Sequence, residues 1–187
     1  TADTRLYVMD ADGSNLTQIR AISFPGYGFD GEQFAWSPDG TQIVFRDSVS
    51  PGTGEIYLIN SDGTGETQLS VGDTEGVAKR LTNLCWSPGG DYIVGSAVWF
   101  DGSSNVWVAY RYELDGTTPE THLFPTNPAW GIQNFRQMYV FSNRIWYIED
   151  QFKVSSVALD GTDYTNDVDI SGTSSAGFSS ALGFNYP

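Results

Sequence analysis

The stretch Phe34-Ala35-Trp36-Ser37-Pro38-Asp39-Gly40 decides the fold, because it recurs 50 residues later as Leu84-Cys85-Trp86-Ser87-Pro88-Gly89-Gly90. In each copy a short apolar run enters a Ser-Pro turn, where proline presets φ and glycine allows a positive φ. An alternating run follows each turn, at residues 42–45 and 91–94. The pattern predicts two strands joined by a tight turn, repeated along the chain.

A second motif runs beside the first with the same spacing. Leu6-Tyr7-Val8-Met9-Asp10-Ala11-Asp12-Gly13 matches Ile56-Tyr57-Leu58-Ile59-Asn60-Ser61-Asp62-Gly63, and weaker copies lie at 109–116 and 157–161. Each Asp-Gly pair predicts a turn that closes a hairpin into another strand. Helical periodicity is nearly absent, so each unit is predicted to be a four-stranded antiparallel meander.

The spacing of the repeats identifies the architecture. The Asp-Gly pairs of this second motif begin at residues 12, 62, 115 and 160, which gives spacings of 50, 53 and 45 residues. About 40–50 residues is typical of one blade of a β-propeller. We therefore predict an all-β fold of about four propeller-type blades, with an incomplete terminal blade.

These motifs resemble a known family. The Trp-Ser-Pro-Asp-Gly turn and the Ile-Tyr-Leu-Ile-x-x-Asp-Gly-Thr run at 56–64 look like the TolB-type, WD-like propeller repeat. Similar blades occur in the propellers of prolyl-oligopeptidase-type peptidases. The resemblance is strong over the first 70 residues, moderate over 81–123 and only in outline over 134–187. It implies the fold, and it leaves the function open because such blades serve many scaffolds.

The predicted strands do not fill four complete blades. One repeat domain, 1–187, is divided into the blade parts 5–20, 33–70, 83–124, 136–170 and 180–186. The first part holds only the last two strands of a blade, and the last part holds only a first strand. Either this final strand, with Leu182 and Phe184, pairs with the hairpin around Leu6, Tyr7 and Val8 to close a ring, or the ends stay open and pair with another chain. TolB-like propellers usually have more than four blades, which favours a cut piece or an assembled state.

Composition excludes several classes of function. The 187 residues (20.5 kDa) include 9 Lys and Arg against 23 Asp and Glu, a formal charge of −14 that repels nucleic acids and anionic membranes. No apolar stretch is long enough for a membrane helix. One cysteine and one histidine exclude a disulfide framework, a Cys-rich zinc site and a His-His metal clamp. We expect no cofactor.

Candidate catalytic and metal sites each have a simpler structural interpretation. Asp10 begins a calcium-like loop, but Ala21 stands where an EF-type loop needs glutamate, so a hairpin turn is favoured. His122 falls in a predicted strand, and no Gly-x-Ser-x-Gly elbow accompanies it. Cys85 follows an apolar residue beside a tryptophan and is predicted to be buried, while the neighbours Glu149-Asp150 in a predicted turn do not converge as a glycosidase pair. The sequence therefore predicts no enzyme.

The six tryptophans divide into two groups. Four occupy predicted strands and are interpreted as core: Trp36, Trp86, Trp107 and Trp146. Trp99 and Trp130 lie near predicted loops, where an aromatic ring either packs on its own blade or contacts a sugar or a protein partner.

The resulting functional hypothesis is a non-catalytic scaffold, periplasmic or extracellular, for protein binding or self-assembly through the incomplete blade. Alternatives are a subunit of an extracellular filament, a carbohydrate-binding module using Trp99 or Trp130, and the accessory propeller of a hydrolase without its catalytic domain. The chain begins Thr1-Ala2-Asp3, which suggests a processed or cut product. Asn15-Leu16-Thr17 is a formal glycosylation sequon that matters only on a glycosylating route.

Overall fold

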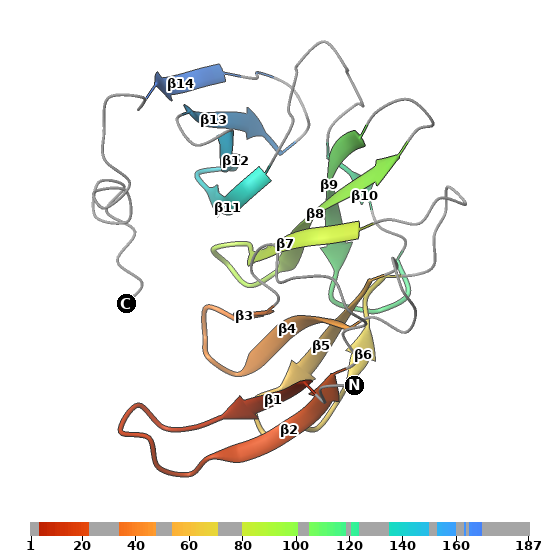
Figure 1. Ribbon diagram of the computed structural model, residues 1–187, viewed down its shortest axis with the longest axis vertical. Helices are drawn as coiled ribbons and strands as arrows, with labels where there is room; N and C mark the ends of the chain where they lie inside the picture. Colours follow the sequence, from red (N-terminus) through yellow and green to blue (C-terminus); the bar gives the residue numbers. More distant parts are fainter. Residues whose placement is uncertain are drawn as a thin grey trace.

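The fold is a series of four antiparallel sheets that follow one another in chain order (Figure 1). The structure is a computed structural model and describes residues 4–22, 34–47, 54–70, 80–100, 105–118, 121–123, 135–149, 153–159, 163 and 165–169. The first sheet is a hairpin of β1 (Thr4–Val8) and β2 (Thr17–Ile22). The other three sheets have four strands each.

Each four-stranded sheet is a meander whose strands pair in sequence order. The second sheet contains β3 (Phe34–Trp36), β4 (Gln42–Asp47), β5 (Glu55–Asn60) and β6 (Thr67–Gln68). The third contains β7 (Arg80–Trp86), β8 (Tyr92–Phe100), β9 (Asn105–Glu113) and β10 (Thr121–His122). The fourth contains β11 (Phe135–Phe141), β12 (Arg144–Glu149), β13 (Lys153–Ala158) and β14 (Thr165–Asp169).

This arrangement confirms the predicted fold class. The described residues contain strands and turns but no helix, and in particular no helix that is long and apolar enough to cross a membrane. We number the sheets as blades 1 to 4, so that the hairpin is blade 1. Its two strands correspond to β5 and β6, because the motif of β1 recurs in β5. Residues 180–186, predicted to supply a further strand, lie outside the described residues.

The core lies between the blades rather than within any one of them. Residues of β4 alternate between two clusters: Val44 packs toward blade 3, and Ile43 and Phe45 pack toward blade 1. In blade 3, Leu84 and Trp86 pack toward blade 2, while Cys85 packs toward blade 4. A sheet buried on both faces reads as a nearly continuous apolar run, which explains the runs seen in the sequence.

Two names follow from this packing. The near face of a blade is the side turned toward the preceding blade, and the far face is turned toward the next one. Blade-to-blade burial of these faces is the main hydrophobic contribution to stability, at about 25 cal/mol per Å² of apolar surface.

The glycines of two Asp-Gly turns, Gly63 and Gly116, approach the last strand of the preceding blade. A Cβ built on Gly116 would lie 2.5 Å from Thr67 Cγ2 and 2.8 Å from the Gln68 carbonyl oxygen, both in β6. A Cβ on Gly63 would lie 3.4 Å from Ile19 in β2. A Cβ on Gly13 would meet nothing within 4 Å. All three glycines have positive φ, so they differ in their neighbours and not in their backbone conformation.

We expect Gly116→Ala to destabilise the protein more than Gly13→Ala. Both substitutions place a Cβ in the left-handed region, at about 1–2 kcal/mol. Only Gly116→Ala also forces a Cβ against the backbone of the neighbouring blade, which adds about 1–3 kcal/mol. Urea denaturation of the two variants measures the difference. Equal losses would contradict the close contact between blades 2 and 3.

Candidate functional site

The candidate site is the open side of the blade 1 hairpin. In the other three blades the third strand is central: β5, β9 and β13 are each paired along both edges. Their counterpart β1 pairs with β2 alone among the described residues. An unpaired strand edge presents a row of backbone donors and acceptors to any further strand.

Hydrogen bonds at the hairpin turn show which backbone groups lie on that edge. The Asp10 N–H donates to the Ser14 carbonyl at 2.9 Å, and the Asp10 carbonyl accepts from Gly13 N–H at 2.9 Å, so both groups of Asp10 face β2. Backbone groups of successive residues in a strand point to opposite edges. The N–H and carbonyl groups of Tyr7 and Met9 therefore face the open edge.

The side chains of the near face of blade 1 are largely exposed. Tyr7 and Met9 are 45% and 60% exposed. Gln18 Oε1 accepts hydrogen bonds from Arg5 Nη1 at 3.1 Å and from the Tyr7 hydroxyl at 3.4 Å, which holds these three side chains on one face. Leu16, exposed as well, alternates with Gln18 and shares that face. The site is thus a strand edge beside a small amphipathic face.

The far face of the hairpin is firmly attached to blade 2. Leu6 and Ile22 are buried against it. Arg20 forms salt bridges with Asp47 (3.3 Å) and Glu66 (2.8 Å). Its guanidinium also lies 5.8 Å from the centre of the Tyr57 ring. Desolvation is the main reason why the pKa of Tyr57 is raised. Blade 1 is therefore a fixed part of the fold, and its open edge is a stable surface.

Trp36 corrects one prediction. It was assigned to the core, but its side chain is 43% exposed, whereas the matching Trp86 is 8% exposed. Trp86 Nε1 donates to the carbonyl of Ala35 in the first strand of the preceding blade, at 3.1 Å. The matching position for Trp36 is the first strand of blade 1, which is not among the described strands. The tryptophan of the first copy is therefore more exposed than that of the second, because no first strand of a preceding blade is described beside it.

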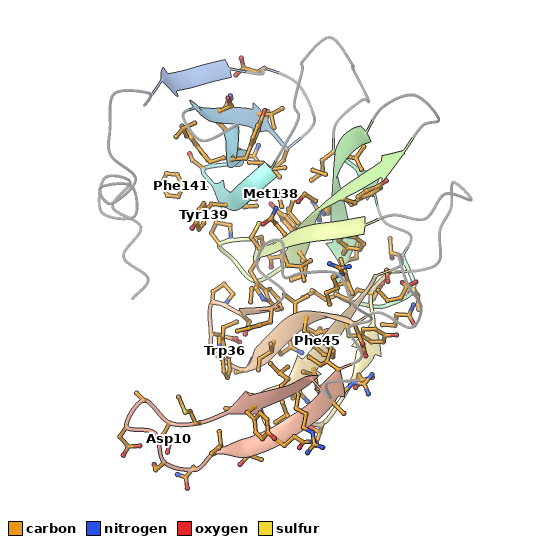
Figure 2. All side chains as sticks on the ribbon, viewed as in Figure 1. Asp10, Trp36, Phe45, Met138, Tyr139 and Phe141 are labelled. Atoms are coloured by element: carbon orange, nitrogen blue, oxygen red, sulfur yellow. The ribbon has the colours of Figure 1, made fainter. Side chains whose placement is uncertain are left out.

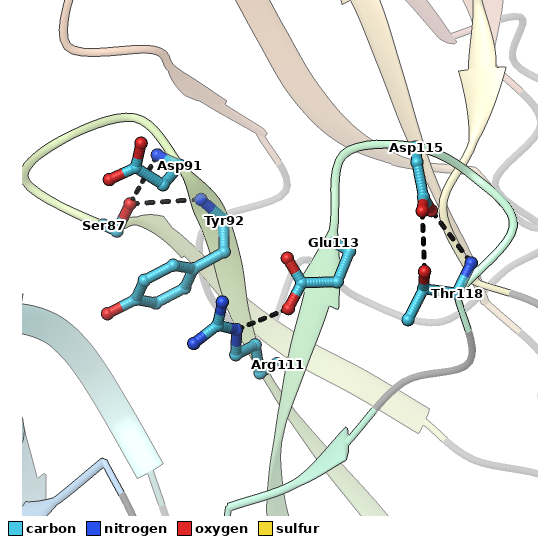
Figure 3. A network of polar contacts seen from close by, with 7 residues as sticks. All are labelled: Ser87, Asp91, Tyr92, Arg111, Glu113, Asp115 and Thr118. Carbon is cyan, nitrogen blue, oxygen red and sulfur yellow. Dashed lines mark hydrogen bonds and ion pairs between the residues drawn. The ribbon is translucent and has the colours of Figure 1, made fainter.

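The turn residues of the first motif form a bonded loop at both copies. Ser37 is buried, its N–H donates to the Gln42 carbonyl, and its hydroxyl accepts from the Gln42 N–H at 2.9 Å. The Ser87 hydroxyl accepts from the N–H groups of Asp91 and Tyr92 (Figure 3). Pro38 and Pro88 sit second in these turns, and Gly40 and Gly90 take positive φ. The motif is a structural turn.

Carboxylates of the turns are bonded in a way that favours their ionised form. Ser37 and Thr41 donate to Asp39, which lowers its pKa. The bonds made by Ser14 and Thr64 lower the pKa values of Asp12 and Asp62. A general acid needs a raised pKa, so these turn carboxylates, whose pKa values are lowered, are not suited to that role.

Asp115 shows the largest effect of this kind. The Thr118 hydroxyl donates to it at 2.6 Å and the Thr118 N–H at 2.8 Å (Figure 3). The Thr117 N–H also donates to it, at 2.8 Å. These bonds, that of the Thr118 hydroxyl first, lower the pKa of Asp115 to about 2. Nearby, the Arg111 guanidinium pairs with Glu113 at 2.6 Å and lies 4.0 Å from the centre of the Tyr92 ring.

The other candidate site residues do not gather at one place, or they lie outside the described residues. β8 extends to Phe100, so Trp99 lies next to the end of a strand, where its backbone pairs with Val106. Cys85 is buried, as expected, and His122 lies in β10. Glu149 ends β12 and is not in a turn. Trp130, Leu182 and Phe184 lie outside the described residues.

No group of three or more metal-binding side chains is gathered among the residues described by the structure. The residues that sequence reasoning missed are Arg5, Met9, Leu16 and Gln18 on the near face of blade 1. A signal for Met9 was present, because the matching residue in the second copy is Ile59, and such a position packs on a preceding blade. The alternation of side chains along the predicted strand did not show which of its two faces is exposed, because that requires the burial of each residue.

Three solved structures share this fold. A protein assigned as TolB from Agrobacterium tumefaciens matches with a TM-score of 0.59 and 19% identity, over 90% of this chain and 56% of that one. An oligogalacturonate lyase in complex with manganese matches with a TM-score of 0.56 and 14% identity, over 88% and 42%. A protein assigned as a 6-phosphogluconolactonase from Bacteroides uniformis matches with a TM-score of 0.52 and 13% identity, over 89% and 49%.

These structures support a propeller-type fold like that of TolB. No protein-family model matches the sequence, and neither does any curated protein. The chain spans about half the length of the structures that it matches. Since the neighbours include enzymes as well as a TolB protein, the likeness shows the fold alone.

We expect Trp86→Phe to lower the free energy of unfolding by about 1–2 kcal/mol, because it leaves the Ala35 carbonyl without its donor. The matched variant Trp36→Phe should change it by less than about 0.5 kcal/mol, as is usual for exposed positions. Chemical denaturation compares the two. A larger loss for Trp36→Phe would show that its indole has a buried role.

A second expectation concerns acid stability. The pKa of Asp115 is depressed to about 2, so its bonds stabilise the fold above the ordinary aspartate value near pH 4. That contribution is lost as the pH falls from about 4 to 2. Asp115→Asn should flatten the fall of melting temperature in this window, and Thr118→Val should flatten it in part. An unchanged profile in both variants would exclude Asp115 as a source of the pH dependence.

Proposed function

We propose that this chain is a non-catalytic propeller scaffold that binds a protein strand, in the first instance one from a second copy, along the open edge of β1. The carrying observation is that β1 pairs with β2 alone among the described strands, whereas its counterparts in the three other blades are central. Strand addition to such an edge is a common mode of protein recognition.

The chemistry of the edge supports pairing. Exposed edges are usually protected by charge, proline or a covering element. β1 carries one charged residue, Arg5, beside the exposed Tyr7, and Met9 extends the edge toward the turn. The hairpin is anchored by its far face, so pairing on the open edge requires no rearrangement of blade 2.

The turn carboxylates act as structural hydrogen-bond acceptors, which fits a scaffold. Asp12, Asp39, Asp62 and Asp115 are engaged as hydrogen-bond acceptors, and their pKa values are lowered. We further propose that the protein acts outside the cytoplasm, in the periplasm or the extracellular space, by analogy with the TolB-type fold. Glycan binding through Trp99 or Trp130 stays a prediction.

The backbone contribution can be tested at Tyr7. Tyr7→Ala and Tyr7→Pro both remove the ring, but only proline removes the N–H on the open edge. We expect the proline variant to self-associate about tenfold more weakly than the alanine variant, equivalent to about 1.4 kcal/mol. Sedimentation velocity over a concentration series measures both, and thermal melts check that both are folded.

Two results would contradict the proposal. One is equal association of the alanine and proline variants, which would remove the backbone edge from the contact. The other is a wild-type protein that sediments as a 20.5 kDa species at every concentration, which would exclude self-pairing.

A further inference from the structure

The near face of blade 1 is one half of a contact that the fold makes three times elsewhere. Two side chains of each third strand point toward the preceding blade at matching repeat positions: Tyr7 and Met9 in β1, Tyr57 and Ile59 in β5, Tyr110 and Tyr112 in β9. Ile59, Tyr110 and Tyr112 are buried by the blade before them. Tyr7 and Met9, with no blade before them among the described strands, are about half exposed.

The Gly13 turn likewise has no described blade beside it. Gly63 and Gly116 lie against the last strand of the preceding blade, and Gly13, in the same turn, meets nothing within 4 Å. The exposed side chains of Tyr7 and Met9 and the open space beside Gly13 therefore both indicate room for a blade on the near face of the hairpin.

The other end of the series offers a matching surface. On blade 4, Met138 and Val140 face blade 3, and Tyr139 and Phe141 alternate with them on the far face (Figure 2). Phe141 is 57% exposed. Trp146 pairs with Tyr139 across the sheet, and its indole N–H is buried without a hydrogen-bond partner among the described residues.

We propose that the near face of blade 1 is a docking surface for the far face of blade 4 of a second copy, so that copies associate head to tail. The inference rests on the proposed assembly role and specifies its partner and geometry. A second copy fits because near and far faces of this repeat already pack together at every internal junction. The matched propeller structures are also about twice as long as the region that this chain covers.

Face docking and strand pairing at β1 are separate contacts. The two contacts use different surfaces, side chains in one case and backbone in the other. Because the surfaces are unlike each other, the contact is heterologous and forms a closed ring or a filament according to its rotation.

Complementary blocked variants test the inference. Met9→Asp places a charge on the near face, and Phe141→Asp places one on the far face. Each variant alone should be monomeric in sedimentation velocity, because every junction needs both faces. Mixed in equal amounts, they should form a 1:1 heterodimer and nothing larger, because one intact near face and one intact far face remain.

Matched control variants distinguish the effect of where the charge is placed from the effect of the charge itself. Thr121→Asp adds the same charge on the exposed outer strand of blade 3 and should associate like the wild type. Leu16→Asp is a second block of the near face and should behave like Met9→Asp. Thermal melts check that each variant is folded.

The outcomes decide between the proposals. Failure of the two blocked variants to pair when mixed, association of either blocked variant alone, or a monomeric wild type would overturn head-to-tail docking. Strand pairing is judged separately, by Tyr7→Pro against Tyr7→Ala. If those two associate equally while the mixed variants still form a heterodimer, face docking stands and edge pairing fails.

Discussion

The structure depends on one constraint: the sheets of blades 2 and 3 are apolar on both faces, and each packs between two other sheets. Val44 faces one neighbour of β4 and Phe45 the other, and the same alternation separates Trp86 from Cys85 in β7. A single meander of this kind would expose both apolar faces to water if it stood alone. Stability therefore belongs to the junctions between blades, and blades 1 and 4 each have one neighbour among the described sheets.

The turns set the spacing that makes those junctions regular. Buried Ser37 and Ser87 hold the first turn, and bonded aspartates such as Asp115 hold the turn between the third and fourth strands. Their carboxylates supply part of the net charge of −14 while acting as acceptors at the surface. The acidity of the chain is thus partly a consequence of how its turns are made, and it remains an argument against nucleic acid as a partner.

The two-stranded blade 1 connects the fold to the proposed function. Blade 1 is held firmly through Arg20 and Leu6, yet its β1 edge and its near face are positions that other blades fill with a strand and a sheet. The surface of blade 1 is already ordered by its anchoring, so little conformational freedom is lost upon binding. This reduces the entropic cost of association. The packing of sheet against sheet that stabilises the interior also predicts that the exposed faces of blades 1 and 4 bind another sheet.

The sequence by itself determined the strand order, the turn chemistry and the propeller class, because period, alternation and Ser-Pro and Asp-Gly turns are local properties. It also pointed to Leu6, Tyr7 and Val8 as a strand at the incomplete end. Only the tertiary structure decided that Trp36 is exposed while Trp86 is buried, and that Met9 shares a face with Tyr7 and Gln18. Identical motifs carry identical local preferences, but burial depends on whether another sheet lies beside them, and that is fixed by the arrangement of the whole chain.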